Sequence, residues 1–217
     1  MGNWTERFLS MLFPPKCPIC KAITKQFDFC EDCKNHFPSA LIEETFPLES
    51  SRKEMKCMAP LPYQGEYRKV VHRLKFSHKK IYAKTMGYYM AERFMVYPQD
   101  WDEICFVPMT KKEQKQRGYN QSELLAVNLS EKLKVPVLPI LLKIKETDRQ
   151  QGLHKVERRQ NVQGVFKANV SCKEKRILLV DDVVTTGATL KSAAESLYAA
   201  GAEVVQGGCF AATPSKK

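Results

Sequence analysis

Apolar and polar residues follow two different periods along the chain, and the pattern predicts strands separated by helices. Runs typical of strands occupy residues 56–63, 104–108, 137–144, 178–181 and 204–211. Apolar residues at helical spacing occupy residues 66–76, 81–97, 120–133 and 190–200. Strands that alternate with helices indicate an α/β fold whose sheet contains parallel strands, flanked by helices.

The first 54 residues have a different pattern. Apolar residues at helical spacing in 1–13 predict a short amphipathic helix, and Pro14-Pro15 ends it. The remainder, up to a linker-like stretch at 47–54, is too short and too polar to form a hydrophobic core alone. We therefore expect a small N-terminal part, residues 1–54, and an α/β domain, residues 55–217.

Four cysteines of the N-terminal part form two pairs with C-x₂-C spacing, Cys17 with Cys20 and Cys30 with Cys33. Each such turn presents two thiolates on one side of a tight loop, and Zn²⁺ binds four of them tetrahedrally. We expect no secretory signal in residues 1–13, so metal binding is favoured over disulfides, with a redox pair as the alternative. Structural zinc supplies about 10–16 kcal/mol of folding free energy in small peptides, which would compensate for the missing core.

The junction of strand and helix at 177–189 carries the clearest chemistry. Four apolar residues, typical of a strand buried on both faces, precede Asp181 and Asp182. The hydroxyl-rich loop that follows surrounds Gly187 and ends at a helix, whose positive N-terminal end favours an anion. A phosphorylated ribose satisfies both halves, because the carboxylates bind its hydroxyls or Mg²⁺ and the loop binds its phosphate. An ATPase phosphate loop, G-x-x-x-x-G-K-[ST], is missing from the chain.

Two more polar segments are candidates for the same site. Residues 110–121 follow a strand and begin a helix, which predicts a second anion site where Arg117 could bind pyrophosphate oxygens through two hydrogen bonds. Residues 147–161 are polar and basic with one glycine, which is typical of a mobile lid over an anionic substrate. The alternatives are a solvated basic loop for the first segment and a disordered connection for the second.

Residues 177–189 closely resemble the motif of type I phosphoribosyltransferases that binds 5-phosphoribosyl 1-pyrophosphate (PRPP). The resemblance implies that Asp181 and Asp182 engage the ribose hydroxyls. It also implies a cradle for the 5′-phosphate, which consists of Val184, Thr185, Thr186, Gly187, Ala188 and Thr189.

Nearly the whole chain resembles the ComF family of competence-associated proteins. The resemblance rests on the cysteine pairs and on residues 177–189, together with Leu74-Lys75-Phe76, Arg117-Gly118-Tyr119-Asn120-Gln121, and Thr147, Gln150, Gly152-Leu153, Arg158, Asn161 and Phe166. It implies a type I phosphoribosyltransferase-like domain behind a zinc-binding module, and a role in the uptake of transforming DNA alongside a DNA-translocating ATPase. Catalytic roles fall on Asp181, Asp182 and Arg117, PRPP binding also on Lys75 and Lys112, and the lid on Arg149, Gln150 and Arg158.

Two classes of function stay open at this point. The chain is either an active phosphoribosyltransferase, for example of nucleotide metabolism, that releases pyrophosphate from Mg²⁺-bound PRPP to an unidentified acceptor, or a module that only senses PRPP or a nucleotide. A net charge of +11 suits polyanions and favours binding of single-stranded DNA. Bases could stack on aromatic residues that are interleaved with basic ones, although helical spacing favours a place in the core for Tyr63, Tyr67, Phe76 and Tyr82. With no apolar run of 18 residues we expect no transmembrane segment and a cytoplasmic protein.

Overall fold

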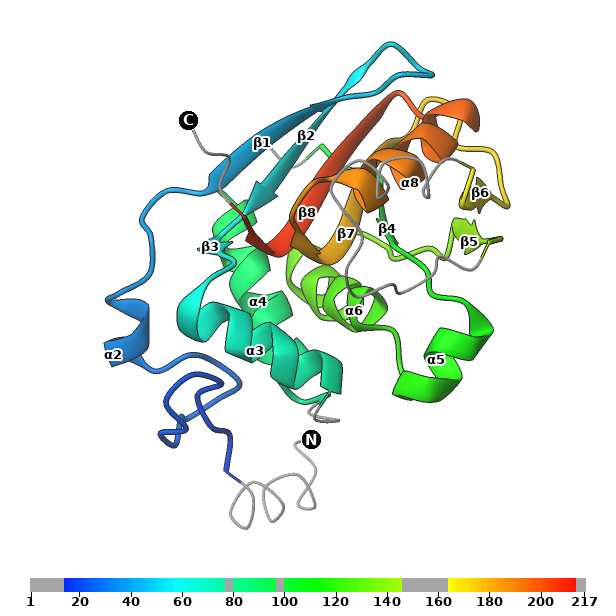
Figure 1. The fold of residues 1–217 in the computed structure, drawn as a ribbon. Helices are drawn as coiled ribbons and strands as arrows, with labels where there is room; N and C mark the ends of the chain where they lie inside the picture. The colour runs from blue at the N-terminus through cyan, green and yellow to red at the C-terminus, as the bar shows by residue number, and fades with distance from the viewer. Residues whose placement is uncertain (1–13, 77–79, 97–99, 146–163, 214–217) are drawn as a thin grey trace.

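A six-stranded sheet forms the centre of the computed structural model, which describes residues 14–76, 80–96, 100–145 and 164–213 (Figure 1). The strand order is β1-β2-β8-β7-β4, and the short β3 also pairs with β8. All neighbours in this sheet are parallel except β1 and β2, so the predicted parallel-containing α/β fold is confirmed. The strands are β1 (Ile42–Pro47), β2 (Glu54–Ala59), β3 (Leu61–Pro62), β4 (Glu103–Phe106), β7 (Arg176–Val184) and β8 (Val204–Ala212).

Helices cover both faces of this sheet (Figure 1). One face carries α3 (Gly65–Phe76), α4 (Tyr82–Phe94) and α6 (Gln121–Leu133). The other face carries α8 (Ala188–Ala199) and a two-stranded ribbon of β5 (Leu141–Lys143) and β6 (Phe166–Ala168). Two shorter helices lie at the periphery, α2 (Glu31–Lys34) and α5 (Lys111–Arg117). Across the described parts of the chain, no helix has the length and apolarity needed to cross a bilayer.

Strand β7 separates two hydrophobic cores. Leu178 and Val180 belong to the core under α3, α4 and α6, whereas Ile177 and Leu179 belong to the core under α8. All four side chains are fully buried. The alternation follows from the two-residue period of a strand, and it explains why the sequence of β7 is apolar at every position from Ile177 to its carboxylates.

The strand predicted at 137–144 is shorter than expected and belongs elsewhere. Only residues 141–143 form a strand, and they pair antiparallel with β6 outside the main sheet. Val137 makes a single bridge to Ile104 of β4. Pro136 and Pro139 explain the difference, because proline lacks the N–H that a continuous ladder requires.

Two segments expected to be irregular are ordered. The linker-like residues 47–54 form the turn of a hairpin between β1 and β2, where Glu195 of α8 accepts hydrogen bonds from the backbone N–H groups of Ser50 and Ser51 at 2.8 and 3.0 Å. Most of the predicted basic loop is helix α5, which begins with a capping box of Thr110 and Glu113 and ends at Gly118. A division of the chain at residue 54 stays a prediction, and β1, which precedes it, belongs to the main sheet.

Candidate functional site

A cleft of about 130 Å³ lies at the carboxyl ends of β4 and β7, beside the first residues of α6. Open α/β sheets bind ligands at this edge. The charged side chains that line it come from α3, α5, β5 and β7, and they are Lys75, Glu113, Arg117, Lys143, Asp181 and Asp182. The fold therefore brings together both predicted carboxylates, Lys75 and Arg117, which are as many as 107 positions apart in the sequence.

Asp182 and Lys75 form an ion pair across the cleft. Lys75 Nζ lies 2.8 Å from Asp182 Oδ2, and the two side chains are 24% and 8% exposed. Burial alone would lower the pKa of Lys75, but the Asp182 carboxylate outweighs it, so the pKa is raised and the ammonium is retained. The pair fixes the last turn of α3 against the end of β7.

Asp181 is held by two hydrogen bonds to one of its oxygens. Its Oδ1 accepts from Ser122 Oγ at 2.7 Å and from the backbone N–H of Asp182 at 2.8 Å. Burial, together with the nearby charge of Asp182, raises the pKa of Asp181 to about 6. Asp181 is therefore largely ionised at neutral pH but takes up a proton at mildly acidic pH. A raised pKa beside a carboxylate that is paired with a lysine is typical of a ligand site.

The segment from Arg117 to Gln121 assembles the other side of the cleft. The hydroxyl of Tyr119 donates to the carbonyl of Leu74, next to Lys75, and so joins this segment to α3. Asn120 caps α6 by accepting from the backbone N–H of Ser122 at 3.0 Å, and its Nδ2 donates to Val107 O at the end of β4. This cap places Ser122 against Asp181.

The loop predicted to cradle a phosphate leads into a helix that lacks a capping side chain at its N-cap. Gly187 holds that position before α8, with φ of +73°. The backbone N–H of Ala188 makes only a long hydrogen bond of 3.5 Å to Thr186 Oγ1. A Cβ atom on Gly187 would lie 2.4 Å from the ring of Phe46 in β1, so both its backbone and its surroundings require glycine. The first turn of α8 thus has donors that suit an anion, as the sequence predicted for residues 185–189.

The remaining predicted ligands are placed unevenly. Thr189 lines the cleft, Thr185 and Thr186 are exposed, Ala188 is half-buried, and Val184 is buried in the core under α8. Lys112 is exposed on α5 and is not among the residues that line the cleft, so its role stays a prediction. The predicted lid residues Arg149, Gln150 and Arg158 lie outside the described residues.

Several residues of the cleft were not singled out from the sequence, although Glu113 and Gln121 lie within the predicted anion-binding segment 110–121. Glu113 of α5 accepts from Lys143 Nζ of β5 at 3.0 Å, and Gln121 accepts from Arg117 Nη1 at 2.9 Å through its Oε1. Ser122 follows the recognised motif directly, and its neighbour Asn120, a strong N-cap residue, was a signal for its position. Nothing local in the sequence pointed to Lys143, because only the turn after α6 brings β5 to the cleft.

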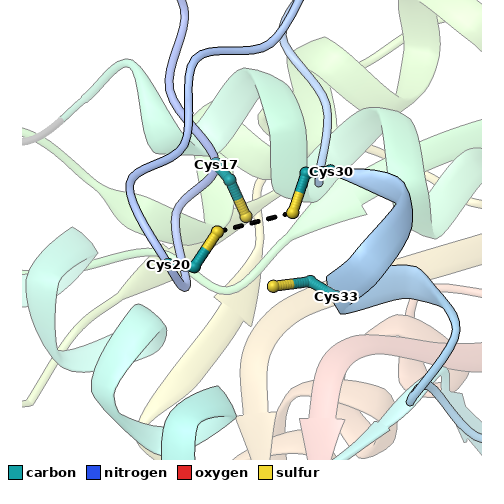
Figure 2. A group of neighbouring side chains, drawn as sticks. All are labelled: Cys17, Cys20, Cys30 and Cys33. Carbon is teal, nitrogen blue, oxygen red and sulfur yellow. Dashed lines mark hydrogen bonds between the residues drawn. The ribbon is translucent and has the colours of Figure 1, made fainter.

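The side chains of the four paired cysteines point toward one another (Figure 2). Their sulfur atoms lie within 4.8 Å of one another, and tetrahedral zinc with bonds of about 2.3 Å separates its sulfurs by about 3.8 Å. A hydrogen bond from the backbone of Ala22, with another from Cys30, lowers the pKa of Cys20 to about 7, whereas burial raises the pKa of Cys33. Four thiolates this close repel one another unless a cation lies between them, so the donor set fits Zn²⁺.

The cysteine module is fastened to the helix that carries Lys75. Pro18 O, inside the first C-x₂-C turn, accepts from Lys21 Nζ at 2.7 Å and from Arg73 Nη1 of α3 at 2.8 Å. Phe29, between the two turns, is 1% exposed and packs on Tyr89 and Phe210. The module is thus part of the core that supports α3.

Comparison with known proteins identifies both parts of the chain. A family model described as phosphoribosyl transferase domain matches residues 120–217, and one described as double zinc ribbon domain matches residues 8–46. Among solved structures, glutamine PRPP amidotransferase from B. subtilis has a TM-score of 0.42 at 22% identity, covering 59% of this chain and 26% of that chain. A purine phosphoribosyltransferase from Pyrococcus horikoshii has a TM-score of 0.39 at 22% identity, covering 61% and 75%.

Curated relatives cover most of the chain. The competence protein F of Haemophilus influenzae is 31% identical over 88% of this chain and 87% of its own length. The DNA utilization protein YhgH of Escherichia coli K12 is 26% identical, covering 91% and 90%, and the competence protein ComFC of Bacillus subtilis is 26% identical, covering 85% and 72%. With its zinc ribbon and its phosphoribosyltransferase-like domain, the chain belongs to the ComF family of competence proteins.

Proposed function

We propose that this protein binds PRPP with Mg²⁺ in the cleft at the carboxyl ends of β4 and β7, and that it acts on DNA that the cell takes up or uses. The observation that carries the ligand is the placement of Asp181 and Asp182 between two helix N-termini. The start of α8 lies beyond the carboxylates along the chain, and the start of α6 reaches Asp181 through Ser122. A ligand with hydroxyls between two anionic ends matches this order of donors and acceptors.

Magnesium fits the donor set of the cleft. Mg²⁺ is commonly held by one or two carboxylates together with substrate phosphates, and the cleft contains Asp181 and Asp182 for that role. When bound with PRPP, the ion would neutralise charge on the pyrophosphate as it leaves. Asp182 is already paired with Lys75, so Asp181 supplies most of the uncompensated negative charge.

In an enzymatic reaction the bond between ribose C1 and pyrophosphate would break as an acceptor attacks C1. Arg117 would stabilise the developing charge on the leaving group, because its guanidinium donates several parallel hydrogen bonds. The carboxylates would hold the ribose, and the first turn of α8 would hold the 5′-phosphate. No acceptor pocket is evident among the described residues, so a module that only senses PRPP or a nucleotide is the second form of the proposal.

Titration calorimetry with PRPP and MgCl₂ tests the ligand, and a pyrophosphate-release assay across bases, nucleosides and DNA oligonucleotides tests the reaction. We expect saturable binding that weakens when Mg²⁺ is removed. Binding together with pyrophosphate release would establish the enzyme, whereas binding without release would establish the sensor. If the protein showed no measurable affinity for PRPP, ribose 5-phosphate or nucleotides, both forms of the proposal would be refuted.

Single-stranded DNA is the proposed macromolecular partner, and helix α5 is the proposed contact. Its exposed face carries Lys111, Lys112 and Lys115 beside the cleft, which suits a phosphate backbone. The aromatic residues considered for base stacking suit it less well. Tyr82 is buried and its hydroxyl accepts from Lys21, and Tyr67 packs on Phe37 and donates to His36 O.

Charge reversal on α5 tests the DNA contact. Lys111→Glu with Lys115→Glu is expected to lower affinity for an oligonucleotide and to reduce the slope of log affinity against log salt by about 0.7 for each phosphate that the variant no longer neutralises. Fluorescence anisotropy at several salt concentrations measures both quantities. Lys173→Glu is the matched control, because this exposed lysine lies in the turn before β7, at the end of that strand opposite to the cleft. Equal slopes for all three proteins would exclude α5 as the contact.

The family resemblance also implies a DNA-translocating ATPase as partner and a cytoplasmic location. Both belong to the proposal and rest on that resemblance alone; the relatives' names, competence and DNA utilization, agree only with a role in handling DNA. A pull-down from competent cells with the full chain, compared with the α5 charge-reversal variant, would identify such a partner.

A further inference from the structure

Gln121 presents an unused pair of hydrogen-bond donors in the cleft. It is the first residue of α6, lines the cleft and is 3% exposed. Its Nε2 atom is buried without a hydrogen-bond partner among the described residues. Native proteins rarely leave a buried N–H group unpaired, because the group has lost its water and gained nothing in exchange.

The orientation of this amide is fixed by its neighbour. Arg117 Nη1 donates to Gln121 Oε1 at 2.9 Å. A guanidinium has only donors, so the amide cannot be turned over without placing two N–H groups against each other. The oxygen of Gln121 therefore faces Arg117, and the two N–H donors of Nε2 face away from it.

The missing partner of Gln121 Nε2 must be a hydrogen-bond acceptor, and the residues around this atom favour an anionic acceptor. Gln121 and Arg117 together offer only donors to a ligand. Lys143 contacts Glu113 at 3.0 Å and Lys75 contacts Asp182 at 2.8 Å, so the charge next to the Gln121 amide is the positive charge of Arg117. An anionic oxygen that accepts from Gln121 Nε2 would be stabilised by this guanidinium.

The geometry of ribose indicates which anion this is. If the ribose hydroxyls lie on Asp181 and Asp182, C5 and C1 point to opposite ends of the hydroxyl edge. The 5′-phosphate occupies the α8 end, so the group on C1 lies toward α6, where Ser122 adjoins Gln121 and contacts Asp181. We propose that the Gln121 amide donates to a non-bridging oxygen of the PRPP pyrophosphate, beside Arg117. The inference rests on the proposed binding of PRPP and deepens it.

The variant Gln121→Glu separates this role from a structural one. It keeps the shape and the oxygen that accepts from Arg117, and replaces the amide donor by a second oxygen. A glutamate in the first turn of α6 is also favourable for the helix, so the fold is retained. We expect PRPP affinity in the presence of Mg²⁺ to fall by about tenfold or more, because the donor is lost and a negative charge is placed beside the pyrophosphate. Affinity for ribose 5-phosphate, which lacks pyrophosphate, is expected to stay within about twofold.

A second pair of proteins tests whether Gln121 acts only by positioning Arg117. In an Arg117→Met background, Gln121→Met is expected to lower PRPP affinity further, because it removes a direct donor. If Gln121 only orients the guanidinium, the double variant binds PRPP as the Arg117→Met protein does, and the inference is overturned.

Each remaining outcome is informative. An equal loss of PRPP and ribose 5-phosphate affinity in Gln121→Glu would also overturn the inference, as would unchanged PRPP affinity. A wild-type protein without affinity for PRPP would instead refute the proposed function, whatever the variants do.

Discussion

Replacement of Asp181 by asparagine is expected to make the free protein more stable and at the same time to remove its affinity for PRPP. Asparagine keeps the Oδ1 atom that accepts from Ser122 and from the Asp182 backbone. It removes the negative charge, which burial and Asp182 oppose in the wild type. A ligand site that is strained without its ligand commonly shows this opposition between stability and function.

The direction of the stability change follows from the pKa of Asp181, which is about 6 in the folded protein against 3.8 for the ordinary group. Between these values the folded state binds more protons than the unfolded state, so stability falls as pH rises from about 4 to 6 and stays reduced above 6. A shift of about two units corresponds to at most about 3 kcal/mol at pH 7.5. Asp181→Asn is expected to recover part of this free energy and to flatten the dependence of stability on pH in that range.

Thermal unfolding monitored by circular dichroism at pH 4.5–8 measures stability, and calorimetry measures PRPP binding. Each recovered kcal/mol is expected to raise the melting temperature by about 2–4 °C. Affinity for PRPP is expected to fall by about 100-fold or more, because a charged hydrogen-bond acceptor or metal ligand is removed. Unchanged PRPP affinity would show that Asp181 is not in the site.

Asp182→Asn is the matched comparison, and it is expected to change stability in the opposite direction. It removes the partner of Lys75 from a pair that meets at 2.8 Å. Breaking a largely buried pair from one side leaves an uncompensated charge and costs about 3 kcal/mol. PRPP affinity is expected to fall here too, so the two variants lose the same function while their melting temperatures move apart. Equal shifts in melting temperature would contradict the assignment of Lys75 to Asp182.

Loss of zinc is expected to have the second large effect, on the N-terminal module and on the cleft together. Substituting Cys17 and Cys30 by serine removes one ligand from each C-x₂-C turn. Structural zinc contributes about 10–16 kcal/mol in small peptides, so its loss removes much of what holds the two turns together. Because Pro18 of the first turn accepts from Arg73, α3 loses a support two residues from Lys75. PRPP affinity is therefore expected to weaken although no cleft residue has changed.

Metal analysis of the purified protein is expected to give one zinc per wild-type chain and none for the double variant. Limited trypsin digestion is expected to cut the variant rapidly at Lys21, Lys25 and Lys34, which lie within or beside the two C-x₂-C turns. Cys172→Ala serves as control, since it removes a buried thiol that is remote from the cluster and should leave zinc content unchanged. A wild-type chain without zinc, or a variant that resists trypsin as the wild type does, would refute the structural role.

Much of the fold was predictable because its signals are local. The apolar run of β7, the helical spacing of α3, α6 and α8, and the C-x₂-C pairs each lie within a short stretch of sequence. The errors arose where a local pattern competed with tertiary context. Residues 137–144 are apolar enough for a strand, but two prolines limit them to a bridge and a short ribbon. The hairpin turn at 47–54 looked like a linker because its contacts are not evident from local composition. The backbone N–H of Leu48 donates to Lys53 O and Leu48 is buried in the core, and Ser50 and Ser51 donate to Glu195 of α8.

The candidate site also contains residues that could be identified from the sequence and residues that only the fold brings together. The carboxylates and the loop around Gly187 could be identified from the sequence, because a strand end and a helix N-terminus place them together whatever the rest of the chain does. The burial of Gly187 under Phe46 could not, since β1 lies about 140 residues away and meets it only across the sheet. The contact of Lys143 with Glu113 and the hydrogen bond from the Tyr119 hydroxyl to the carbonyl of Leu74 could not be identified from the sequence either.

The sequence by itself determined the α/β class and the two C-x₂-C pairs whose sulfur atoms meet in the fold, because spacing along one strand, helix or turn is enough to express them. It also predicted a ribose-phosphate site at residues 177–189, which belongs to the proposed function. Only the tertiary structure decided which charges are paired. It joined Lys75 to Asp182, turned the Gln121 oxygen toward Arg117, and left the amide donors of Gln121 unused. The physical reason is that the strength of a charge or a donor in a cleft depends on its partners and burial, and both are set by segments that meet only when the chain has folded.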